Sequence, residues 1–545
     1  MQLSQRSEWQ RRALITLIAL LALGHAAHYD FFCDDAFITL RYAKNLAEHG
    51  ELSYNLGQRV EGFTSPLWVL LLSATRIAGI PLPSAAQLLA GAAGLATFAA
   101  LMLYWDELAP EAPWLVLAPA LALAISAPFA AWVFGGLETP AFVASFTLGL
   151  AAIARAARTG SLRTSSYAGG AVAFCTLCRP EGATLIAIGS VVACLPSPAS
   201  PERPWRRLCA WLLPILLLVG GYEVFRLFYF GYPLPNTFYV KTSGAGLWAR
   251  GVTYLAFAGG EFGWSLVGAC LLSLALLLIP GPLLRSRRRG KTSRVLPICT
   301  GIAALVHLLY VARVGGDFLD LYRFLAPLLP AAFCLLSCAG NVAFLALGAR
   351  ARFVAPTVLA CLLLAHGQSQ RTMARRAMQV AERARATLRL EPLGWTRLYA
   401  LRWQGIGKWL ARARLATDST AVGAAGALPF FSELPNLDLF GLNDQEVARH
   451  GRIIGNRPGH QRFAQMDYLF AQKPTFVFMS PESTPLQPGR LRYDRYWTSH
   501  GYLPIEIRVD RELCGCPETF YHQFFVRRER ADSLRGRTDA VVGGP

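Results

Sequence analysis

Long apolar segments alternate with short polar segments through the first two thirds of the chain. Apolar runs of roughly 18 or more residues recur, and a run of this length is enough for a helix to cross about 30 Å of hydrocarbon. The pattern predicts a polytopic α-helical membrane protein with about eleven transmembrane helices. The expected spans lie near residues 12–29, 84–104, 113–131, 139–154, 164–178, 181–197, 208–230, 263–284, 296–312, 323–346 and 353–367.

One apolar segment, residues 66–81, does not fit a full crossing. Its sequence "PLWVLLLSATRIAGI" is short for a span and contains Arg76, whose charge is unfavourable in hydrocarbon. If the segment crossed, the basic loop that begins at Arg155 would fall on the side opposite to the other basic loops. We therefore expect an interfacial or re-entrant segment here.

Composition agrees with a membrane protein and bears on its partners. The 545 residues are 54% hydrophobic and 16% charged, whereas soluble domains carry about 25% charged residues. The net charge of +19 raises nucleic acid as a partner, but the basic residues concentrate in loops between spans, where the positive-inside rule places them. We therefore expect a lipid bilayer and no nucleic acid. The basic loops that mark the cytoplasmic side, together with the N-terminus, are 155–163, 202–207, 285–294 and 349–352.

The character of the chain changes after about residue 368. The stretch "RTMARRAMQVAERARATLRL" is basic and predicts a helix along the membrane surface. Short apolar strands then alternate with helical stretches, which indicates an α/β domain. The expected organisation is a transmembrane domain at 1–367, an α/β domain at 368–530 and a disordered tail at 531–545. By the charge count, the α/β domain faces the periplasm or the cell exterior.

Twelve cysteines are scattered along the chain, and most lie in apolar segments, where they act as small hydrophobic residues. Cys175 and Cys178 form a CxxC motif without a second pair, which disfavours a metal site. Cys514 and Cys516 form a CxC motif in the C-terminal domain. Free thiols are favoured there, and a local disulfide is the alternative.

With this topology, five polar loops rich in glycine and proline share the outer side: residues 34–68, 132–140, 179–182, 229–241 and 315–323. Turn formation explains the glycines and prolines but not the charges at or near the membrane surface. These charged residues are Asp34, Asp35, Glu61, Glu138, Arg179, Glu181, Arg226, Lys241, Asp317 and Arg323. Because loops on a rigid scaffold often carry function, we expect one shared extracytoplasmic site.

Two adjacent carboxylates, Asp34 and Asp35, begin an amphipathic helix with the sequence "DAFITLRYAKNLAEHG". A helix N-terminus favours carboxylates, so Asp34 could serve only as a cap. A cap needs one such side chain, however, and leaves the remaining charges unexplained. Near a lipid surface, one aspartate could act as general base towards an acceptor hydroxyl, while arginine and lysine from other loops hold a phosphate leaving group.

Five motifs together resemble a known family. They are "DDAFITLRYAKNLAEHGELSYNLGQRVEGFTSPLW", "WVFGGLET" for a W-x-x-S-G-x-E-T pattern, "CRPEG", "GYPLPNTFYVK" and "GGDFLDLYRFLAP". In the C-terminal domain, "DLFGLND" and "RPGHQRFAQMDYLFAQKPTFV" are also similar to this family. The chain thus resembles, from about residue 30 to about residue 480, the polyprenyl-phosphate-dependent C-type glycosyltransferases (GT-C). It most resembles the terminal β-(1→2)-arabinofuranosyltransferases of mycobacteria and their bacterial relatives. Gly135 replaces the usual small hydroxyl residue of the second motif.

The resemblance implies an enzyme of a bacterial inner (cytoplasmic) membrane. It would transfer an arabinofuranosyl group, or another pentose or hexose, from a polyprenyl-phosphate donor to a glycan or glycolipid acceptor on the outer face. Asp34 and Asp35 would be the catalytic carboxylates, with Asp34 favoured as the base. The donor phosphate would meet Arg179, Arg226, Lys241 and Arg323. The sugar or acceptor would meet Arg41, Arg59, Glu61, Trp68, Glu138, Glu181, Asn236 and Asp317. Some relatives use a divalent cation, and the need for one stays open here.

Two alternatives remain beside the transferase. A polyprenyl-linked glycan transporter or flippase should show internal repeats and broken helices at mid-membrane, and the sequence shows no internal repeat. A non-catalytic scaffold for cell-envelope assembly would tolerate loss of Asp34 and Asp35. The C-terminal domain lacks a P-loop or a GxGxxG in the required context, so we expect it to position an acceptor. His460 in "RPGH" could contact a sugar or phosphate, although a structural role is favoured.

Overall fold

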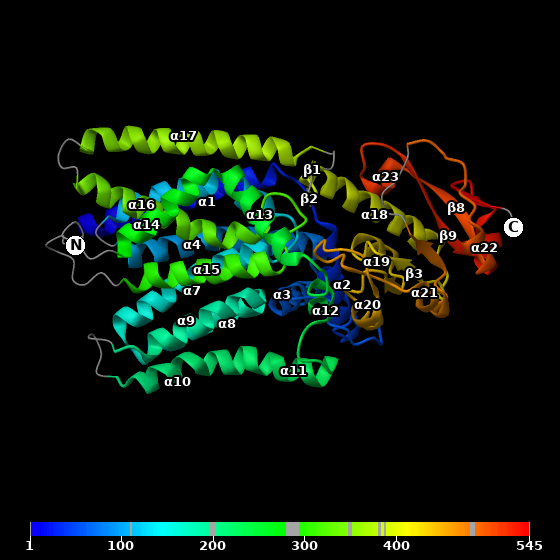
Figure 1. Ribbon diagram of the computed structural model, residues 1–545, viewed down its shortest axis with the longest axis horizontal. Helices are drawn as coiled ribbons and strands as arrows, with labels where there is room; N and C mark the ends of the chain where they lie inside the picture. Colours follow the sequence, from blue (N-terminus) through cyan, green and yellow to red (C-terminus); the bar gives the residue numbers. More distant parts are fainter. Residues whose placement is uncertain are drawn as a thin grey trace.

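The computed structural model describes residues 2–109, 112–196, 202–278, 294–346, 351–379, 383–385, 388–479 and 486–543. Its helices form one elongated bundle, and the C-terminal domain lies at one end of that bundle (Figure 1). The N-terminus lies at the opposite end (Figure 1). Most of the basic residues expected at 285–294 and 349–352 fall outside the described residues.

The helical bundle is made of apolar helices. Their bounds are α1 (Gln2–Ala27), α4 (Leu82–Leu108), α5 (Leu117–Ala124), α6 (Ala127–Val133), α7 (Thr139–Thr159), α8 (Leu162–Cys178), α9 (Ala183–Cys194), α10 (Pro204–Ile215), α11 (Gly221–Phe230), α13 (Leu247–Phe262), α14 (Trp264–Leu278), α15 (Val295–Arg313), α16 (Leu329–Ala346) and α17 (Ala351–Ala377). Small residues allow some of these helices to approach closely. The buried Trp211 of α10, for example, occupies the space beside Gly189 of α9 where a larger side chain would stand.

Several helices have the length and composition of membrane spans. Within the described ranges, five pass this criterion: Leu82–Leu108, Thr139–Thr159, Pro204–Phe230, Val295–Arg313 and Arg323–Val342. Two bent pairs, Pro113–Ala124 with Ala127–Val133 and Leu247–Phe262 with Leu266–Leu277, raise the number to seven if each pair is one span. The chain is therefore mostly helical with several membrane-length helices, while the count of about eleven crossings stays a prediction.

The segment expected to be interfacial or re-entrant forms α3 (Pro66–Ile77), a helix of 12 residues. Such a helix is about 18 Å long, which is less than the roughly 30 Å of a hydrocarbon core. It lies with α2 (Asp34–His49) and α12 (Asn236–Lys241) where the bundle meets the C-terminal domain (Figure 1). A full crossing by α3 alone is excluded by its length.

The C-terminal domain is an α/β domain, as the sequence predicts. Its six-stranded sheet has the order β10-β8-β9-β7-β3-β4, with β3 parallel to both β4 and β7 and the other pairs antiparallel. The strands are β3 (Thr420–Val422), β4 (Asn436–Asp438), β7 (Phe476–Phe478), β8 (Tyr502–Val509), β9 (Phe520–Arg527) and β10 (Ala540–Val542). The helices are α18 (Leu393–Ala413), α19 (Ala427–Ser432), α20 (Gln445–His450), α21 (Met466–Gln472), α22 (Arg495–Ser499), α23 (Arg511–Cys514) and α24 (Arg528–Ala531).

Alternate residues of β9 are buried, which explains how a strand with polar positions contributes to the core. Phe520, His522, Phe524 and Val526 face inward, and the residues between them are partly exposed. The period of two is that of a strand with one covered face.

Three local features differ from the sequence-based expectations. The stretch after residue 368 is not a separate surface helix, because α17 continues to Ala377 and is followed by a short hairpin, β1 (Arg383–Arg385) with β2 (Leu388–Leu390). The tail expected to be disordered from 531 contributes β10, which pairs with β8 through backbone hydrogen bonds. Cys514 and Cys516 form a disulfide, the less favoured alternative.

Candidate functional site

The acidic pair lies at the start of α2, where this helix contacts the C-terminal domain. The backbone N–H of Cys33 donates to Gly135 O at 3.1 Å, which holds the entry to α2 against the 132–140 loop. Asp34 is buried, with 7% of its surface exposed, and its Oδ1 accepts a hydrogen bond from the Ala427 N–H at 2.9 Å. The Asp34 carboxylate is therefore held by a hydrogen bond from a residue almost 400 positions away in the sequence.

The neighbouring Gly426 leaves no room for a side chain. A methyl group at this position would overlap the backbone oxygen of Asp34. The pKa of Asp34 is raised to about 7, chiefly by burial and to a smaller extent by the nearby charge of Asp35, while the Ala427 and Gly426 N–H groups oppose the rise. A carboxyl group with a pKa near neutrality can accept or release a proton under ordinary conditions.

Asp35 points to a different environment. Burial raises its pKa, and the positive charges of Arg323 and Lys241 oppose that rise. The two aspartates therefore differ in role: Asp34 is held by backbone N–H groups, whereas Asp35 lies among cations. This separation follows from their positions on a helix, because adjacent residues point about 100° apart around its axis.

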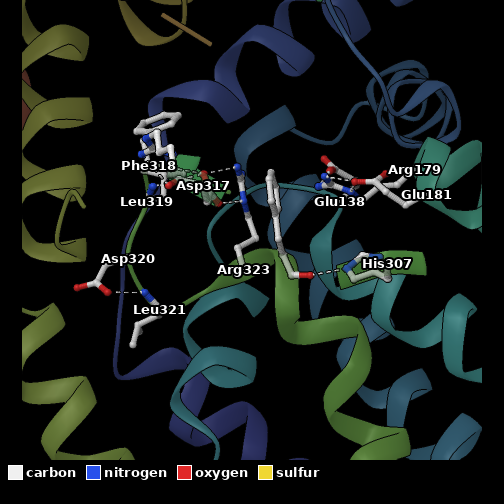
Figure 2. Close-up of polar contacts among 12 residues, drawn as sticks. Glu138, Arg179, Glu181, His307, Asp317, Phe318, Leu319, Asp320, Leu321 and Arg323 are labelled. Carbon is white, nitrogen blue, oxygen red and sulfur yellow. Dashed lines mark hydrogen bonds and ion pairs between the residues drawn. The ribbon is translucent and has the colours of Figure 1, made fainter. Parts of the chain in front are cut away.

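The loop of residues 315–323 presents an arginine through a strained backbone. Leu321 and Tyr322 have positive φ angles of 58° and 45°, which non-glycine residues adopt rarely. After this turn, Arg323 Nε and Nη2 donate to the two carboxylate oxygens of Asp317 at 2.9 and 3.2 Å. Figure 2 shows this paired contact, which fixes the guanidinium but leaves Nη1 without a hydrogen bond among the described residues.

A second arginine is held by two carboxylates. Arg179 Nη1 donates to Glu138 at 2.7 Å, and its Nη2 donates to Glu181 at 2.8 Å (Figure 2). The ring of Phe324 lies close to both guanidinium groups, 5.1 Å from that of Arg179 and 5.2 Å from that of Arg323. The charge of Arg179 is therefore neutralised by two carboxylates.

Lys241 ends α12, and its positive charge acts on Asp35. Its ammonium makes no hydrogen bond or ion pair with any residue that the structure describes. Burial lowers its pKa, and the charge of Asp35 opposes that change. A partly buried ammonium next to a carboxylate and without a direct partner is suited to an incoming anion.

Other sequence-predicted residues lie apart from the acidic pair. Arg226 Nε donates to Glu61 at 2.7 Å, and Tyr222 donates to the same carboxylate at 2.6 Å. The exposed Arg59 lies over the ring of Tyr229, with 4.8 Å between the guanidinium carbon and the ring centre. This group forms a separate polar cluster beneath the 229–241 loop.

Of three further candidates, Arg41 and Asn236 connect the bundle to the C-terminal domain, and Trp68 packs within the bundle. Arg41 donates to the backbone oxygens of Tyr54 at 2.7 Å and Leu434 at 2.8 Å. Asn236 donates to the backbone oxygen of Gly441 at 2.8 Å. Trp68 is buried, and its Nε1 donates to the backbone of the 132–140 loop. None of the three lines the cavity described next.

A cavity of about 630 Å³ lies between the start of α2, the 315–323 loop and the C-terminal domain. Asp34 and Asp35 line it on the side of the helical bundle, and residues that the sequence did not single out line it on the side of the C-terminal domain. These residues include Glu391, Trp395, Tyr399, Asn456 and Arg457. Its volume falls within the range of about 300–1,000 Å³ of small-molecule sites.

Arg457 brings the C-terminal domain into the charge network of this cavity. It forms an ion pair with Glu391, and its guanidinium lies 4.9 Å from the ring centre of Phe318. His460 packs edge-on against Phe318 and Phe440, and burial together with the charge of Arg457 lowers its pKa to about 3. His460 is therefore neutral at physiological pH. The sequence signals for this wall were the "RPGH" motif and the "DLFGLND" motif, whose Phe440 and Leu442 also line the cavity.

Within the described ranges, no group of three or more histidine, cysteine, aspartate or glutamate side chains is placed to hold a metal ion.

Part of the chain matches a family model described as a domain of unknown function, DUF8728, at residues 390–525. The chain is also 28% identical over 353 residues to the terminal beta-(1->2)-arabinofuranosyltransferase of Corynebacterium glutamicum, covering 58% of this chain and 50% of the relative. It is 28% identical over 363 residues to the enzyme of the same name from Mycobacterium tuberculosis, covering 61% and 55%. The chain thus spans about half the length of these relatives, and the resemblance indicated by the motifs is confirmed.

Solved structures also show similarity. ArnT from Cupriavidus metallidurans bound to undecaprenyl phosphate aligns with a TM-score of 0.48 and 13% identity, covering 78% of this chain and 85% of that one. The oligosaccharyltransferase of Archaeoglobus fulgidus, in complex with Zn and sulfate, aligns with a TM-score of 0.47 and 10% identity, covering 78% and 62%. Both TM-scores are below 0.5, so these two likenesses support no statement about chemistry.

Proposed function

We propose that the protein is a membrane glycosyltransferase of the GT-C type that takes a sugar from a polyprenyl-phosphate donor. The observation that carries the proposal is the cavity at the membrane end of the C-terminal domain, which Asp34 and Asp35 line. The positive charges of Arg323 and Lys241 act on Asp35, so two cations lie near the acidic pair although they do not line the cavity themselves. Acid–base groups close to anion-binding groups are what sugar transfer from a phosphate carrier requires.

In the proposed reaction, Asp34 accepts the proton of the acceptor hydroxyl. The hydroxyl oxygen bonds to the anomeric carbon of the donor sugar, and the bond between that carbon and the phosphate oxygen breaks. The electron pair of the broken bond stays on the phosphate. Because the pKa of Asp34 is about 7, the side chain is available as a base at neutral pH.

Lys241 and Arg323 then stabilise the leaving phosphate. The ammonium of Lys241 has no direct partner among the described residues, and Asp317 holds the Arg323 guanidinium in place. Charged donors fixed in advance stabilise developing negative charge more effectively than mobile ones. Asp35 orders these cations and weakens their repulsion before the donor binds.

The acceptor is proposed to be a cell-envelope glycan or glycolipid, seated on the wall of the cavity that the C-terminal domain forms. Aromatic side chains suit this role because they stack against sugar rings, and Trp395 and Tyr399 of α18 line the cavity. The donor sugar is proposed as arabinofuranose, in keeping with the printed names of the two curated relatives. Another pentose or hexose is the alternative.

We also propose that the site and the C-terminal domain face the outside of the bacterial inner membrane. Arg11, Arg12 and the basic turn at 155–163 lie at the far end of the bundle, which the positive-inside rule assigns to the cytoplasm. The disulfide between Cys514 and Cys516 suits an oxidising compartment.

The test is transfer of a labelled sugar from a synthetic polyprenyl-phosphate donor by membranes that contain the protein. Asp34→Asn should reduce the rate by about 100-fold or more, which is the usual contribution of a general base. Asp510→Asn, which removes an exposed carboxylate far from the cavity, is the matched control. An Asp34→Asn variant that is expressed at the normal level and transfers sugar at the normal rate would refute the assigned base.

A further inference from the structure

A second concavity lies at the end of the bundle that is remote from the C-terminal domain. It has a volume of about 460 Å³ and is formed by the last turns of α4, the second half of α7 and the first half of α8. Arg11, near the N-terminus, donates to Asp106 of α4 at 2.6 Å, which places this groove at the N-terminal end of the bundle (Figure 1). The groove is therefore separate from the cavity at Asp34.

The inner wall of the groove is apolar. It consists of Leu103, Leu148, Ala151 and Ala152. Leu103 and Leu148 are 38% and 37% exposed, although they belong to membrane-length helices. Exposed leucines on the side of such a helix meet acyl chains in a bilayer.

The rim of the groove carries four charged side chains, which are Asp106, Glu107, Arg155 and Arg163. The acidic ones are already neutralised: Asp106 binds Arg11, and both oxygens of Glu107 accept from Arg158 at 2.8 Å. Arg155 and Arg163 form no ion pair within the part of the chain that the structure describes. The rim therefore has an uncompensated positive charge.

The two free guanidinium groups come from helices joined by a tight turn. Arg155 belongs to the last turns of α7, and Arg163 belongs to the first turn of α8. Arg163 Nε donates to the Tyr167 hydroxyl at 2.9 Å, and its guanidinium lies 5.3 Å from the Tyr167 ring centre. Tyr167 thereby holds one arginine on the same rim as the other.

We propose that this groove binds one anionic phospholipid, with the phosphate between Arg155 and Arg163 and an acyl chain along the leucine and alanine wall. The charge selects an anion, because guanidinium groups bind phosphate oxygens through paired hydrogen bonds. The apolar wall selects a lipid over a free phosphate. Basic pockets between helices on the cytoplasmic side of membrane proteins are suited to lipid headgroups.

The experiment uses the purified full-length protein in a mild detergent. Native mass spectrometry counts bound lipid during titration with phosphatidylglycerol, with zwitterionic phosphatidylcholine and with soluble glycerol phosphate. One phosphatidylglycerol should bind with preference over both other ligands. The double variant Arg155→Gln/Arg163→Gln should weaken its binding by about 30-fold.

The matched control is Arg206→Gln, which removes an exposed arginine from the same end of the bundle but outside the groove. It should leave phosphatidylglycerol binding unchanged. Equal binding of the two lipids, binding of glycerol phosphate as tight as that of the lipid, or undiminished binding by the double variant would each overturn the proposal. Elution volume and melting temperature without added lipid show that the variants are folded.

Discussion

Replacing Asp34 by asparagine should stabilise the protein, and the gain should increase with pH. Burial raises the pKa of Asp34 from 3.8 to about 7. Since the folded state holds this proton more tightly than the unfolded state, the stability of the wild-type protein falls as the pH rises from about 4 to 7. Asparagine has nearly the same shape, keeps an acceptor oxygen for the Ala427 N–H and has no proton to lose.

The size of this effect follows from the two pKa values. Each tenfold change in proton affinity corresponds to about 1.4 kcal/mol. The difference between 3.8 and about 7 therefore opposes folding by about 4 kcal/mol at pH 8, where Asp34 is ionised in both states. At pH 5 the same relation gives about 2 kcal/mol. The advantage of Asp34→Asn should thus grow by about 2–3 kcal/mol between pH 5 and pH 8.

The assay is thermal unfolding of the detergent-solubilised wild-type and Asp34→Asn proteins at intervals from pH 5 to pH 8. The melting temperature of the variant should exceed that of the wild type, by a margin that widens with pH. Asp510→Asn serves as the control, because that carboxylate is exposed and should give a constant difference. A difference in melting temperature between Asp34→Asn and the wild type that stays constant from pH 5 to pH 8 would refute the conclusion that burial raises the pKa of Asp34.

Three further outcomes are expected. Gly426→Ala should lower sugar transfer by about 100-fold, because its methyl group would displace Asp34, and unchanged rates would show that the close contact is unimportant. Lys241→Gln should raise the KM for the polyprenyl-phosphate donor by about tenfold or more with little change for the acceptor, whereas Lys408→Gln should change neither. His522→Phe should make the melting temperature less sensitive to acid. Burial lowers the pKa of His522 from 6.5 to about 4, so the folded state binds fewer protons than the unfolded state in acid. The free energy of unfolding should therefore fall by about 2 kcal/mol as the pH falls from 7.5 to 5. An unaltered acid dependence of the His522 variant would contradict this.

Much of the helical architecture could be predicted because the length of an apolar run in the sequence shows whether a helix can span the membrane. The segment at 66–81 illustrates this, since its shortness and its arginine were enough to exclude a full crossing, and α3 is indeed a helix of 12 residues. No helix was predicted at residues 247–262. They form α13, which meets the following helix at a bend of 92°, and a bent pair of helices is difficult to recognise from the sequence pattern.

The candidate site was only half predictable. The acidic pair and the cations of the polar loops could be named, because charges beside a lipid surface are unusual. Which partner each charge takes depends on distances that a sequence does not contain. Arg179 therefore proved to be neutralised by Glu138 and Glu181, and Arg226 proved to pair with Glu61.

The wall formed by the C-terminal domain was largely missed for the same reason. Ala427 and Arg457 lie about 400 residues from the aspartates in the sequence. Neither an alanine nor an arginine by itself indicates a functional site. Only folding brings the Ala427 N–H to Asp34 and the Arg457 charge to the cavity.

A structure of the protein with a bound polyprenyl-phosphate analogue would show whether the carrier binds beside the acidic pair. We expect phosphate oxygens within about 3 Å of Lys241 Nζ and Arg323 Nη1, with the carboxylate of Asp34 open to the cavity. A phosphate bound elsewhere on the molecule, with these two cations untouched, would contradict the proposed function.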